Sequence, residues 1–406
     1  MKILIVMSGG FDTYGPSRHL YHALIEDFLE NGDLVHLIES HSTGNDPDVP
    51  KEFLENKLFS YEIININSVP KRAFVRRYLT GLKYTRKCKK PLKKAKGLFD
   101  IVLVQSCVWA PFMVPLVKKT TKSFVVWNIQ DMFPGASIAN GVLKNGLLKK
   151  FFFRLHKRAY KKADHITVIS DDMRLKVIEQ GYQGDRITVI SDWFDDRSVK
   201  QIPWSDNLFV KEYGLRKDLF YVQYAGTMGF NFDYHVVIEV AKILINHDDI
   251  VFQMIGFGSQ MKNFMDEANQ QNLKNIVFYP LQKQEMVSHV YSSCSVCLIP
   301  LPIGVIGNSV PSKIGLLMAC KKPVISTSDK DSLYIKMIND NGFGFGFGDK
   351  DYNDVANSIV YLKNNPDVCK TMGEKGYDFG HIIYSRSYNT RKYIDLFHLL
   401  WKGEKQ

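Results

Sequence analysis

Near its N-terminus the chain reads KILIVMSGG (2–10), an apolar run of strand length that two glycines interrupt. A helical pattern follows at 17–29, and after NGD (31–33) comes a second apolar run, LVHLI (34–38). Strand, glycine turn, helix and strand make a βαβ unit, in which both strands lie parallel in one sheet. The stretch therefore predicts an α/β fold built on a doubly wound parallel sheet.

The same alternation fills two long regions that an irregular stretch separates. This stretch contains Pro203 and few apolar pairs, and we expect it to be a linker at 196–215. Two Rossmann-like domains are predicted, at 1–195 and 216–383, followed by an amphipathic helix from 384. The other strands are expected at 101–104, 123–127, 165–169, 186–190, 219–225, 250–255, 275–279, 295–300 and 323–326.

Length and composition exclude several classes of protein. The 406 residues are 45% hydrophobic and 13% aromatic, which is typical of globular rather than disordered chains. The length is enough for two domains, and we expect a cleft between them. No window holds about 18 consecutive apolar residues, and the first apolar run is too short for a secretory signal. The sequence therefore predicts a cytoplasmic protein without a membrane-spanning helix.

The six cysteines suggest neither disulfides nor a metal site. Several lie inside apolar runs of a long chain, so we expect buried thiols. Cys294 and Cys297 form a CxxC pair, but no second pair exists, and zinc is not expected. No acidic triplet or histidine cluster has metal-ligand spacing. We predict no metal and no cofactor.

Positive charge is concentrated in two stretches. Lys and Arg exceed Asp and Glu by 53 − 42 = +11. Twelve cations and no acid lie in 71–96, and eight cations and no acid lie in 144–162, where Leu148, Phe152, Leu155 and Ala159 form a helical stripe. A solvated basic face, a lipid surface and nucleic acid are all compatible with this pattern. No nucleic-acid module is recognisable, and we favour a membrane surface.

Three glycine-containing turns are candidate phosphate sites. AGTMG (225–229) follows an expected strand and precedes a helix expected from about Tyr234, and IGFGS (255–259) repeats the arrangement. In GNSVPSK (307–313), Ser309 followed by Pro311 indicates a helix start, and the lysine at the end adds a positive charge. A diphosphate fits this pattern, although plain turns and a plain helix cap explain it as well.

Seven stretches in order carry a resemblance to a known family. The stretches are DMFPGASIANG (131–141), ADHITVIS (163–170), YAGTMG (224–229), MIGFGS (254–259), NIVFYP (275–280), SVPSK (309–313) and MACKKPVI (318–325). Together they resemble retaining glycosyltransferases of family 4 with the GT-B fold, in the branch of bacterial surface polysaccharide synthesis that includes colanic acid and N-acetylfucosamine transferases.

The resemblance implies which residues bind the substrates. The C-terminal half would bind a nucleotide sugar, with UDP favoured over GDP, and the N-terminal half a lipid-linked saccharide acceptor; the tail helix (384–406) would pack back on the first domain. The expected donor-binding residues are Gly226, Thr227, Gly229, Gly256, Gly258, Asn308, Ser309, Pro311, Ser312, Lys313, Asp331 and Ser332. The expected acceptor-binding residues are Gly10, Gly15, Ser17, Gln130 and Asp131.

The chain also departs from the family pattern. Many members carry two Glu separated by seven residues where this chain has Asn308 and Leu316, so no carboxylate at 316 can hold the ribose. The Arg and Lys that commonly follow the glycine turn are missing from 229–233, and Gln130 stands where many relatives have His. These losses place more of the diphosphate charge on Lys313 and on backbone N–H groups.

The implied reaction is sugar transfer with retention at the anomeric carbon. Lys313 would stabilise the leaving diphosphate, and Asp131 would orient or deprotonate the acceptor hydroxyl. A polyprenyl diphosphate acceptor would explain both basic stretches through peripheral contact with the inner face of the plasma membrane. The alternatives are a nucleotide-sugar 2-epimerase, an inactive GT-B homologue with a binding role, and a nucleic-acid-binding protein.

Overall fold

The chain forms two compact units, each with its own sheet. The computed structural model describes residues 1–403 except 12–16, 43–46, 68, 70–73, 140 and 142. Unit 1 comprises Met1–Asp192 and Asn389–Gln406, and unit 2 comprises Trp193–Tyr388. The stretch expected as a linker lies in unit 2, where it contains the short helices η2 (Trp204–Asp206) and α9 (Leu208–Tyr213).

The sheet of unit 1 has seven parallel strands in the order β3-β2-β1-β4-β5-β6-β7. The central strands are almost wholly buried, as expected for a parallel sheet covered on both faces. This confirms the predicted doubly wound α/β class. The strands are β1 (Lys2–Ser8), β2 (Leu34–Ser42), β3 (Phe59–Ile66), β4 (Ile101–Val104), β5 (Phe124–Ile129), β6 (His165–Val168) and β7 (Ile187–Val189).

The sequence analysis missed β3. The strand reads FSYEIINI, and only one of its eight side chains is buried. As the edge strand of the sheet, β3 has one neighbour, β2. The pairing begins with Phe59 of β3 opposite Val35 of β2. Polar residues therefore interrupt the apolar run that marks the buried strands.

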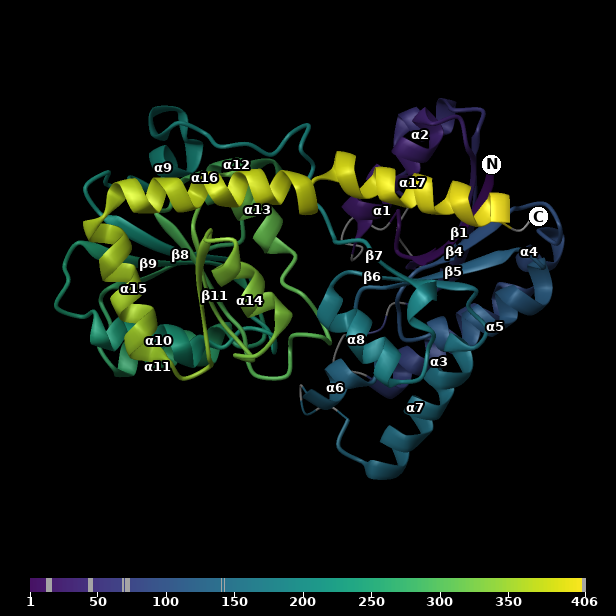
Figure 1. The fold of residues 1–406 in the computed structure, drawn as a ribbon, viewed down its shortest axis with the longest axis horizontal. Helices are drawn as coiled ribbons and strands as arrows, with labels where there is room; N and C mark the ends of the chain where they lie inside the picture. The colour runs from purple at the N-terminus through teal and green to yellow at the C-terminus, as the bar shows by residue number, and fades with distance from the viewer. Residues whose placement is uncertain are drawn as a thin grey trace. The chain divides into compact units, whose positions relative to one another are not determined.

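Helices cover both faces of the unit 1 sheet (Figure 1). On one face α1 packs against the end of the chain, where the rings of Phe28 and Phe397 stack with centroids 5.3 Å apart. The other face is covered by α3, α5 and α7. The helices are α1 (Arg18–Glu30), α2 (Lys51–Glu55), α3 (Phe74–Lys87), α4 (Lys89–Lys94), α5 (Ala110–Thr121), α6 (Gly135–Ala139), α7 (Gly146–Tyr160) and α8 (Asp171–Glu179), with η1 at Gly184–Arg186.

Unit 2 contains a second parallel sheet, in the order β10-β9-β8-β11-β12-β13. Five of its six strands coincide with apolar runs that the sequence predicts, and the sixth, β13, reads GFGF, in which glycine and phenylalanine alternate. The strands are β8 (Phe220–Thr227), β9 (Ile250–Phe257), β10 (Ile276–Tyr279), β11 (Val296–Pro300), β12 (Val324–Thr327) and β13 (Gly344–Phe347).

The two faces of this sheet have separate apolar cores. In β8, Tyr221 and Ala225 point to one core and Val222 and Tyr224 to the other, because side chains alternate along a strand. Helices α12, α13 and α16 cover the first face, and α10, α11 and α15 the second (Figure 1). The helices are α10 (Tyr234–Ile243), α11 (Met261–Gln270), η3 (Gln284–Met286), α12 (Val287–Ser292), α13 (Lys313–Ala319), α14 (Leu333–Asp340), α15 (Tyr352–Asn364) and α16 (Pro366–Ile383).

The last helix, α17 (Arg386–Gly403), belongs to unit 1 from Asn389 onward. Its Tyr393 hydroxyl accepts a hydrogen bond from Asn128 Nδ2 at 2.9 Å and lies 3.2 Å from Thr167 Oγ1. All three side chains are buried, so the bonds satisfy polar groups that would otherwise be costly to bury. They connect the end of the chain to β5 and β6.

We predict that His156 makes unit 1 sensitive to acid. Its ring is buried between Trp127 and Phe133, and burial lowers its pKa to about 3, from an ordinary value of 6.5. Between about pH 6.5 and about pH 3, the His156 ring is therefore protonated in the unfolded chain and neutral in the folded chain. The free energy of unfolding falls as pH drops through this range. Replacing His156→Phe should reduce the stability lost between about pH 7 and about pH 5 by about 2 kcal/mol.

Urea unfolding followed by tryptophan fluorescence at the two pH values measures this difference. The exposed His235, replaced by Phe, is the control and should leave the acid sensitivity unchanged. Equal acid sensitivity in wild type and His156→Phe would show that the prediction is wrong.

Candidate functional site

The ends of β8 and β9 approach each other so closely that only glycine fits. Gly226 pairs with Gly256 across the two strands, and a Cβ on Gly256 would lie 2.0 Å from the Gly226 carbonyl oxygen. A Cβ on Gly258 would lie 2.1 Å from the carbonyl oxygen of Met228. Backbone packing thus explains why residues 256 and 258 are glycine. A bound ligand is not needed to explain either of them.

At Gly226 and Gly229 the nearest atoms to an added Cβ belong to side chains, whereas at Gly256 and Gly258 they belong to the backbone. Gly226 has a φ of +144°, and a Cβ there would lie 2.8 Å from the ammonium nitrogen of Lys313. Around Gly229 the nearest atom to such a Cβ is Thr227 Cγ2, at 3.6 Å. The neighbouring Thr227 side chain is exposed, while its carbonyl accepts a hydrogen bond from Tyr224. The turn after β8 is therefore open toward Lys313.

Lys313 is the first residue of α13 and is half-buried. Its Nζ lies 3.7 Å from the centre of the Tyr224 ring, at the distance of a cation–π contact. No carboxylate of the described residues lies within 4.0 Å, and burial lowers the pKa of Lys313 to about 7. A bound anion would favour the charged ammonium, so this recess is suited to a phosphate group.

The loop before Lys313 differs from the sequence prediction. Ser309 does not start the helix: its N–H donates to the Val305 carbonyl, and α13 begins four residues later, with Ser312 preceding it. Asn308 is buried and donates to the Gly304 carbonyl at 2.7 Å, so it holds the loop in shape. Pro311 is buried and Ser312 exposed. The loop at 305–312 carries no charged side chain, and Lys313 follows it directly as the first residue of α13.

The turn after β12 places Asp331 and Ser332 at the start of α14. Ser332 caps this helix by accepting a hydrogen bond from the Ile335 N–H at 3.2 Å, and Asp331 beside it is exposed. The sequence analysis missed the hydroxyls of Thr327 and Ser328, which are buried and have no hydrogen-bond partner among the described residues. Polar residues directly after an apolar strand are the signal that could have identified them.

Large apolar side chains are exposed at the same edge of the unit 2 sheet. Phe230 follows β8, Phe257 ends β9 and Ile303 follows β11, with exposed fractions of 54%, 56% and 60%. Aromatic faces of this kind can stack on a nucleobase. The sequence analysis did not select them, because apolar residues in turns look like ordinary core residues.

In unit 1 the structure brings together Ser17, Gln130 and a residue that the sequence analysis did not select, Asp192. The Ser17 hydroxyl donates to Gln130 Oε1 at 2.9 Å, and Gln130 Nε2 donates to Asp192 Oδ1 at 3.1 Å. Asp131, next to Gln130, is exposed. Burial raises the pKa of Asp192 to about 7, and the charge of Asp131 adds to the shift.

Of the other two expected acceptor residues, the structure describes only Gly10. Gly10 packs against the buried Glu39, whose carboxylate accepts the Phe11 N–H at 2.9 Å, and a Cβ on Gly10 would lie 2.6 Å from it. Gly15 lies outside the described residues. Gly10 therefore has a packing explanation of its own.

The cysteines and the possible metal ligands form neither a disulfide nor a metal site in the described part of the chain. All six thiols are free, and the buried Cys294 and Cys297 have their sulfurs 3.6 Å apart. Among the described residues, no three His, Cys, Asp or Glu side chains are grouped so as to hold a metal ion. No helix in the described part of the chain is long and apolar enough to cross a membrane.

Both halves of the chain match glycosyltransferase families. Residues 15–197 match the family described as Glycosyltransferase Family 4, and residues 206–379 match Glycosyl transferases group 1. Together the two matches cover most of the chain, which belongs to the glycosyltransferases. The unit 2 turns described above lie within the group 1 match.

Individual relatives of this glycosyltransferase are distant. It is 22% identical over 309 residues to the probable glycosyltransferase WbjE of Pseudomonas aeruginosa, covering 75% of each chain. It is also 22% identical to the putative colanic acid biosynthesis glycosyl transferase WcaI of Escherichia coli, over 56% of this chain and 57% of that protein.

Solved structures share the fold over nearly the whole chain. Sucrose-phosphate synthase from Thermosynechococcus elongatus superposes with a TM-score of 0.78 at 15% identity, covering 99% of this glycosyltransferase and 100% of that chain. Anabaena HepE, in complex with UDP and glucose, has a TM-score of 0.73 at 13% identity, covering 98% and 99%. At these identities the likeness shows the GT-B fold.

We predict that the glycines of the two turns differ in their tolerance of a side chain. Gly258→Ala should destabilise the protein by about 1–3 kcal/mol, because its Cβ meets the Met228 backbone, which cannot move without breaking the strand pairing. Gly229→Ala is the matched control and should change stability little. Urea unfolding of both variants tests this, and equal stability would contradict the account of the close backbone approach.

Proposed function

We propose that this glycosyltransferase moves a sugar from a nucleotide sugar, with UDP favoured, to a lipid-linked saccharide, retaining the anomeric configuration. The observation that carries the proposal is the Lys313 ammonium in the recess that Gly226 leaves open. The structure of HepE in complex with UDP and glucose supports a nucleotide-sugar donor. The colanic acid relative supports a role in the synthesis of a bacterial surface polysaccharide, whether O-antigen, capsule or exopolysaccharide.

The leaving group determines what unit 2 must do. When the bond between the anomeric carbon and the diphosphate breaks, the electron pair stays on the diphosphate oxygen, and its negative charge needs stabilisation. Lys313 supplies a positive charge there, beside the turn at 226–229, in which the Met228 N–H is already bonded to the Phe257 carbonyl. The acceptor hydroxyl then bonds to the same face of the sugar. This account needs neither a metal ion nor a cofactor.

Other residues of unit 2, both expected and newly found, have supporting roles in the proposal. Phe230 and Phe257 are exposed beside the turn and can stack on the base, while Asp331 is exposed at the start of α14 and can accept a sugar hydroxyl. Asn308, Gly256 and Gly258 shape the turns that hold these groups. The family carboxylate missing at Leu316 leaves ribose recognition to backbone groups.

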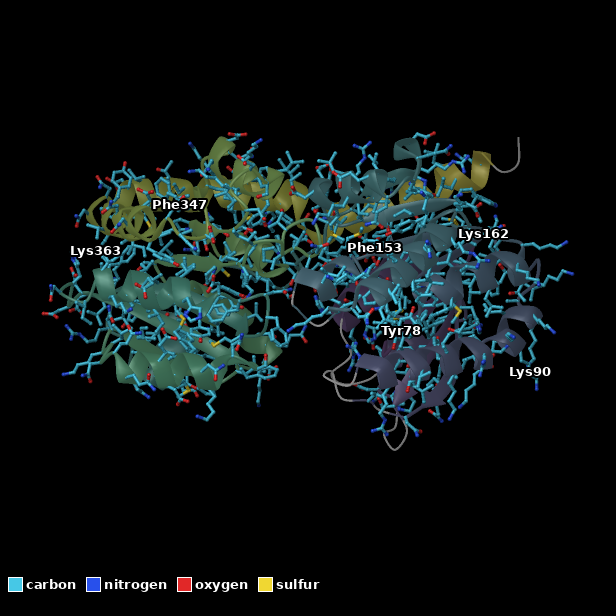
Figure 2. The ribbon with its side chains drawn as sticks, turned by 90° about the horizontal axis from the view of Figure 1, so that it is seen from below. Tyr78, Lys90, Phe153, Lys162, Phe347 and Lys363 are labelled. Carbon is cyan, nitrogen blue, oxygen red and sulfur yellow. The ribbon has the colours of Figure 1, made fainter. Side chains whose placement is uncertain are left out.

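A surface of α3 and α7 suits contact with an anionic membrane. The helices touch through Tyr78 and Phe152, whose ring centroids are 4.9 Å apart. Apolar side chains are exposed among cations, which also continue into α4 and to Lys162 (Figure 2). We define the basic–apolar surface as Leu79, Leu147, Leu148 and Phe151 together with the exposed Arg76, Lys83, Arg86, Lys150, Arg154, Lys157 and Arg158.

We propose that this surface holds the enzyme on the inner face of the plasma membrane, where a polyprenyl diphosphate acceptor resides. Each cation near anionic lipid contributes about 1 kcal/mol of attraction, and the exposed apolar side chains can enter the interface. Lys71 and Arg72, which the sequence analysis counted in the first basic stretch, lie outside the described residues.

Lys313→Ala should lower turnover by at least about 100-fold, because the leaving charge loses its ionic partner. Nucleotide release from UDP-, GDP- and CMP-sugars is measured with and without a lipid-diphosphate saccharide extract. Circular dichroism should show that the variant folds like wild type. Wild-type turnover in Lys313→Ala would contradict the proposed role.

The same assay separates the alternative functions. Nucleotide release that requires the lipid extract supports the transferase, and isomerisation of the donor without any acceptor supports a 2-epimerase. Nucleotide binding without release or isomerisation, across every donor and acceptor, would indicate an inactive homologue with a binding role.

Replacing both Leu147→Glu and Phe151→Glu should weaken binding to phosphatidylglycerol vesicles at least about tenfold, because each change removes an exposed apolar group and adds a repelled charge. Co-sedimentation at low salt measures the binding, and vesicles of phosphatidylcholine alone test the need for anionic lipid. The control is Ile243→Glu, an exposed apolar residue at the end of α10 in unit 2. No binding by wild type, or equal binding by the double variant, would contradict membrane attachment.

A further inference from the structure

Four of the six cysteines gather in one region of the unit 2 core. They are Cys294 after α12, Cys297 in β11, Cys320 directly after α13 and Cys369 in α16. A charge on Cys294 acts on both Cys320 and Cys369, so these distant parts of the sequence lie close together in the fold. The proposed sugar transfer uses none of these thiols.

Within this group, Cys294 and Cys297 are in direct contact. Their sulfurs lie 3.6 Å apart, and both side chains are buried. The sulfurs of Cys320 and Cys369 instead face backbone carbonyl oxygens, each at 3.6 Å. Sulfurs in contact can form a disulfide through rotation about the side-chain bonds. The pair at 294 and 297 is therefore the one that the fold prepares for such a bond.

The surroundings of the pair favour a thiolate at Cys294. Lys322 Nζ donates to the Cys294 carbonyl oxygen at 2.6 Å, which holds a cation beside this residue. Burial opposes ionisation of Cys294, but the hydrogen bond from Cys297 and the charge of Lys322 outweigh it and keep the pKa of Cys294 below its ordinary value. Burial raises the pKa of Cys297, which keeps its proton. A thiolate beside a second thiol is the arrangement that oxidants convert to a disulfide.

The pair lies close beneath the surface of unit 2. Ser295, between the two cysteines, is half-buried, and so is Lys322. The loop that joins α12 to β11 therefore reaches solvent one residue away from the Cys294 sulfur. A molecule as small as hydrogen peroxide can reach the sulfur by a local opening of this loop, whereas a large reagent needs the core to unfold.

We propose that Cys294 and Cys297 are a site of reversible oxidation, at which a hydroperoxide converts the two thiols to a disulfide. The inference goes beyond the proposed function and does not rest on it. Cys294 is the sulfur that the oxidant meets first, and Cys297 is the sulfur that completes the disulfide.

Hydrogen peroxide takes two electrons from the pair. The Cys294 thiolate attacks one peroxide oxygen and the O–O bond breaks, which leaves a sulfenic acid on Cys294. The released hydroxide becomes water with the proton that Cys294 had lost. The Cys297 sulfur then bonds to the Cys294 sulfur as its S–H bond breaks, and the sulfenic hydroxyl leaves with that proton as a second water. Exchange with an external dithiol regenerates both thiols.

Counting free thiols in one tryptic peptide tests the inference in the full chain. Trypsin cleaves after Lys283 and Lys313, and the peptide 284–313 contains both cysteines and no other. The folded protein is treated with hydrogen peroxide, denatured and alkylated with N-ethylmaleimide before digestion. The peptide should carry two labels from untreated wild type, none after peroxide, and two again when dithiothreitol follows the peroxide. Cys107, a half-buried thiol of unit 1, is the internal control and should keep its label.

Single variants identify the sulfur that reacts first. In Cys297→Ser, the sulfenic acid at Cys294 has no second thiol in contact, and dimedone should trap it. In Cys294→Ser, the dimedone adduct on Cys297 should form at least about tenfold more slowly, because that thiol keeps its proton. Cys369→Ser is the matched control and should form the disulfide like wild type. Circular dichroism should show that each variant folds like wild type.

Retention of both labels by peroxide-treated wild type would overturn the inference, and so would a loss of label that dithiothreitol does not restore. Oxidation of Cys107 to the same extent would show that peroxide attacks the thiols without selection, which also contradicts it. Equally fast adducts in the two single variants would contradict the order of attack. No nucleotide sugar enters these measurements, so their outcome is separate from that of the proposed function.

Discussion

Unit 2 of the enzyme depends on the close approach of two backbones at the ends of β8 and β9. A side chain on Gly256 or Gly258 would collide with the carbonyl oxygens of β8 and its turn. Because these positions are glycine, the two strands end in one compact edge, and Gly226 leaves a recess for the Lys313 ammonium. The centre of the Tyr224 ring lies 3.7 Å from that ammonium, and no carboxylate in the described part of the chain lies within 4.0 Å of it. This arrangement is suited to binding an anion.

Much of this arrangement could be predicted from the sequence. The buried strands of both parallel sheets are continuous apolar runs, and glycine turns with a following helix indicate the edge to which we assign phosphate binding in the proposal. Lys313 stands out because it is a cation beside such a turn. The start of α10 at Tyr234 is also as predicted, and its N-terminal cap is the preceding Asp233. These features depend on residues close together in the sequence, so the sequence alone predicts them.

The features that the sequence could not predict depend on contacts between distant segments. Ser309 resembles a helix cap, yet its N–H bonds back to Val305 and the helix begins later. Asp192 is one acid among many until the fold places Gln130 and Asp131 beside it. The half-exposed edge strand β3 lacks the apolar run that marks a buried strand. Each of these cases requires the tertiary structure.

The most direct test of the account is proton uptake when UDP binds. Burial lowers the pKa of Lys313 to about 7, and a bound diphosphate should return the amine to its charged form. Calorimetry at about pH 8, in buffers of different ionisation enthalpy, should find uptake of about 0.9 proton per UDP bound. Lys313→Arg, which is always charged, should bind with no uptake. UDP binding to wild type without proton uptake would contradict the assignment of Lys313 to the diphosphate.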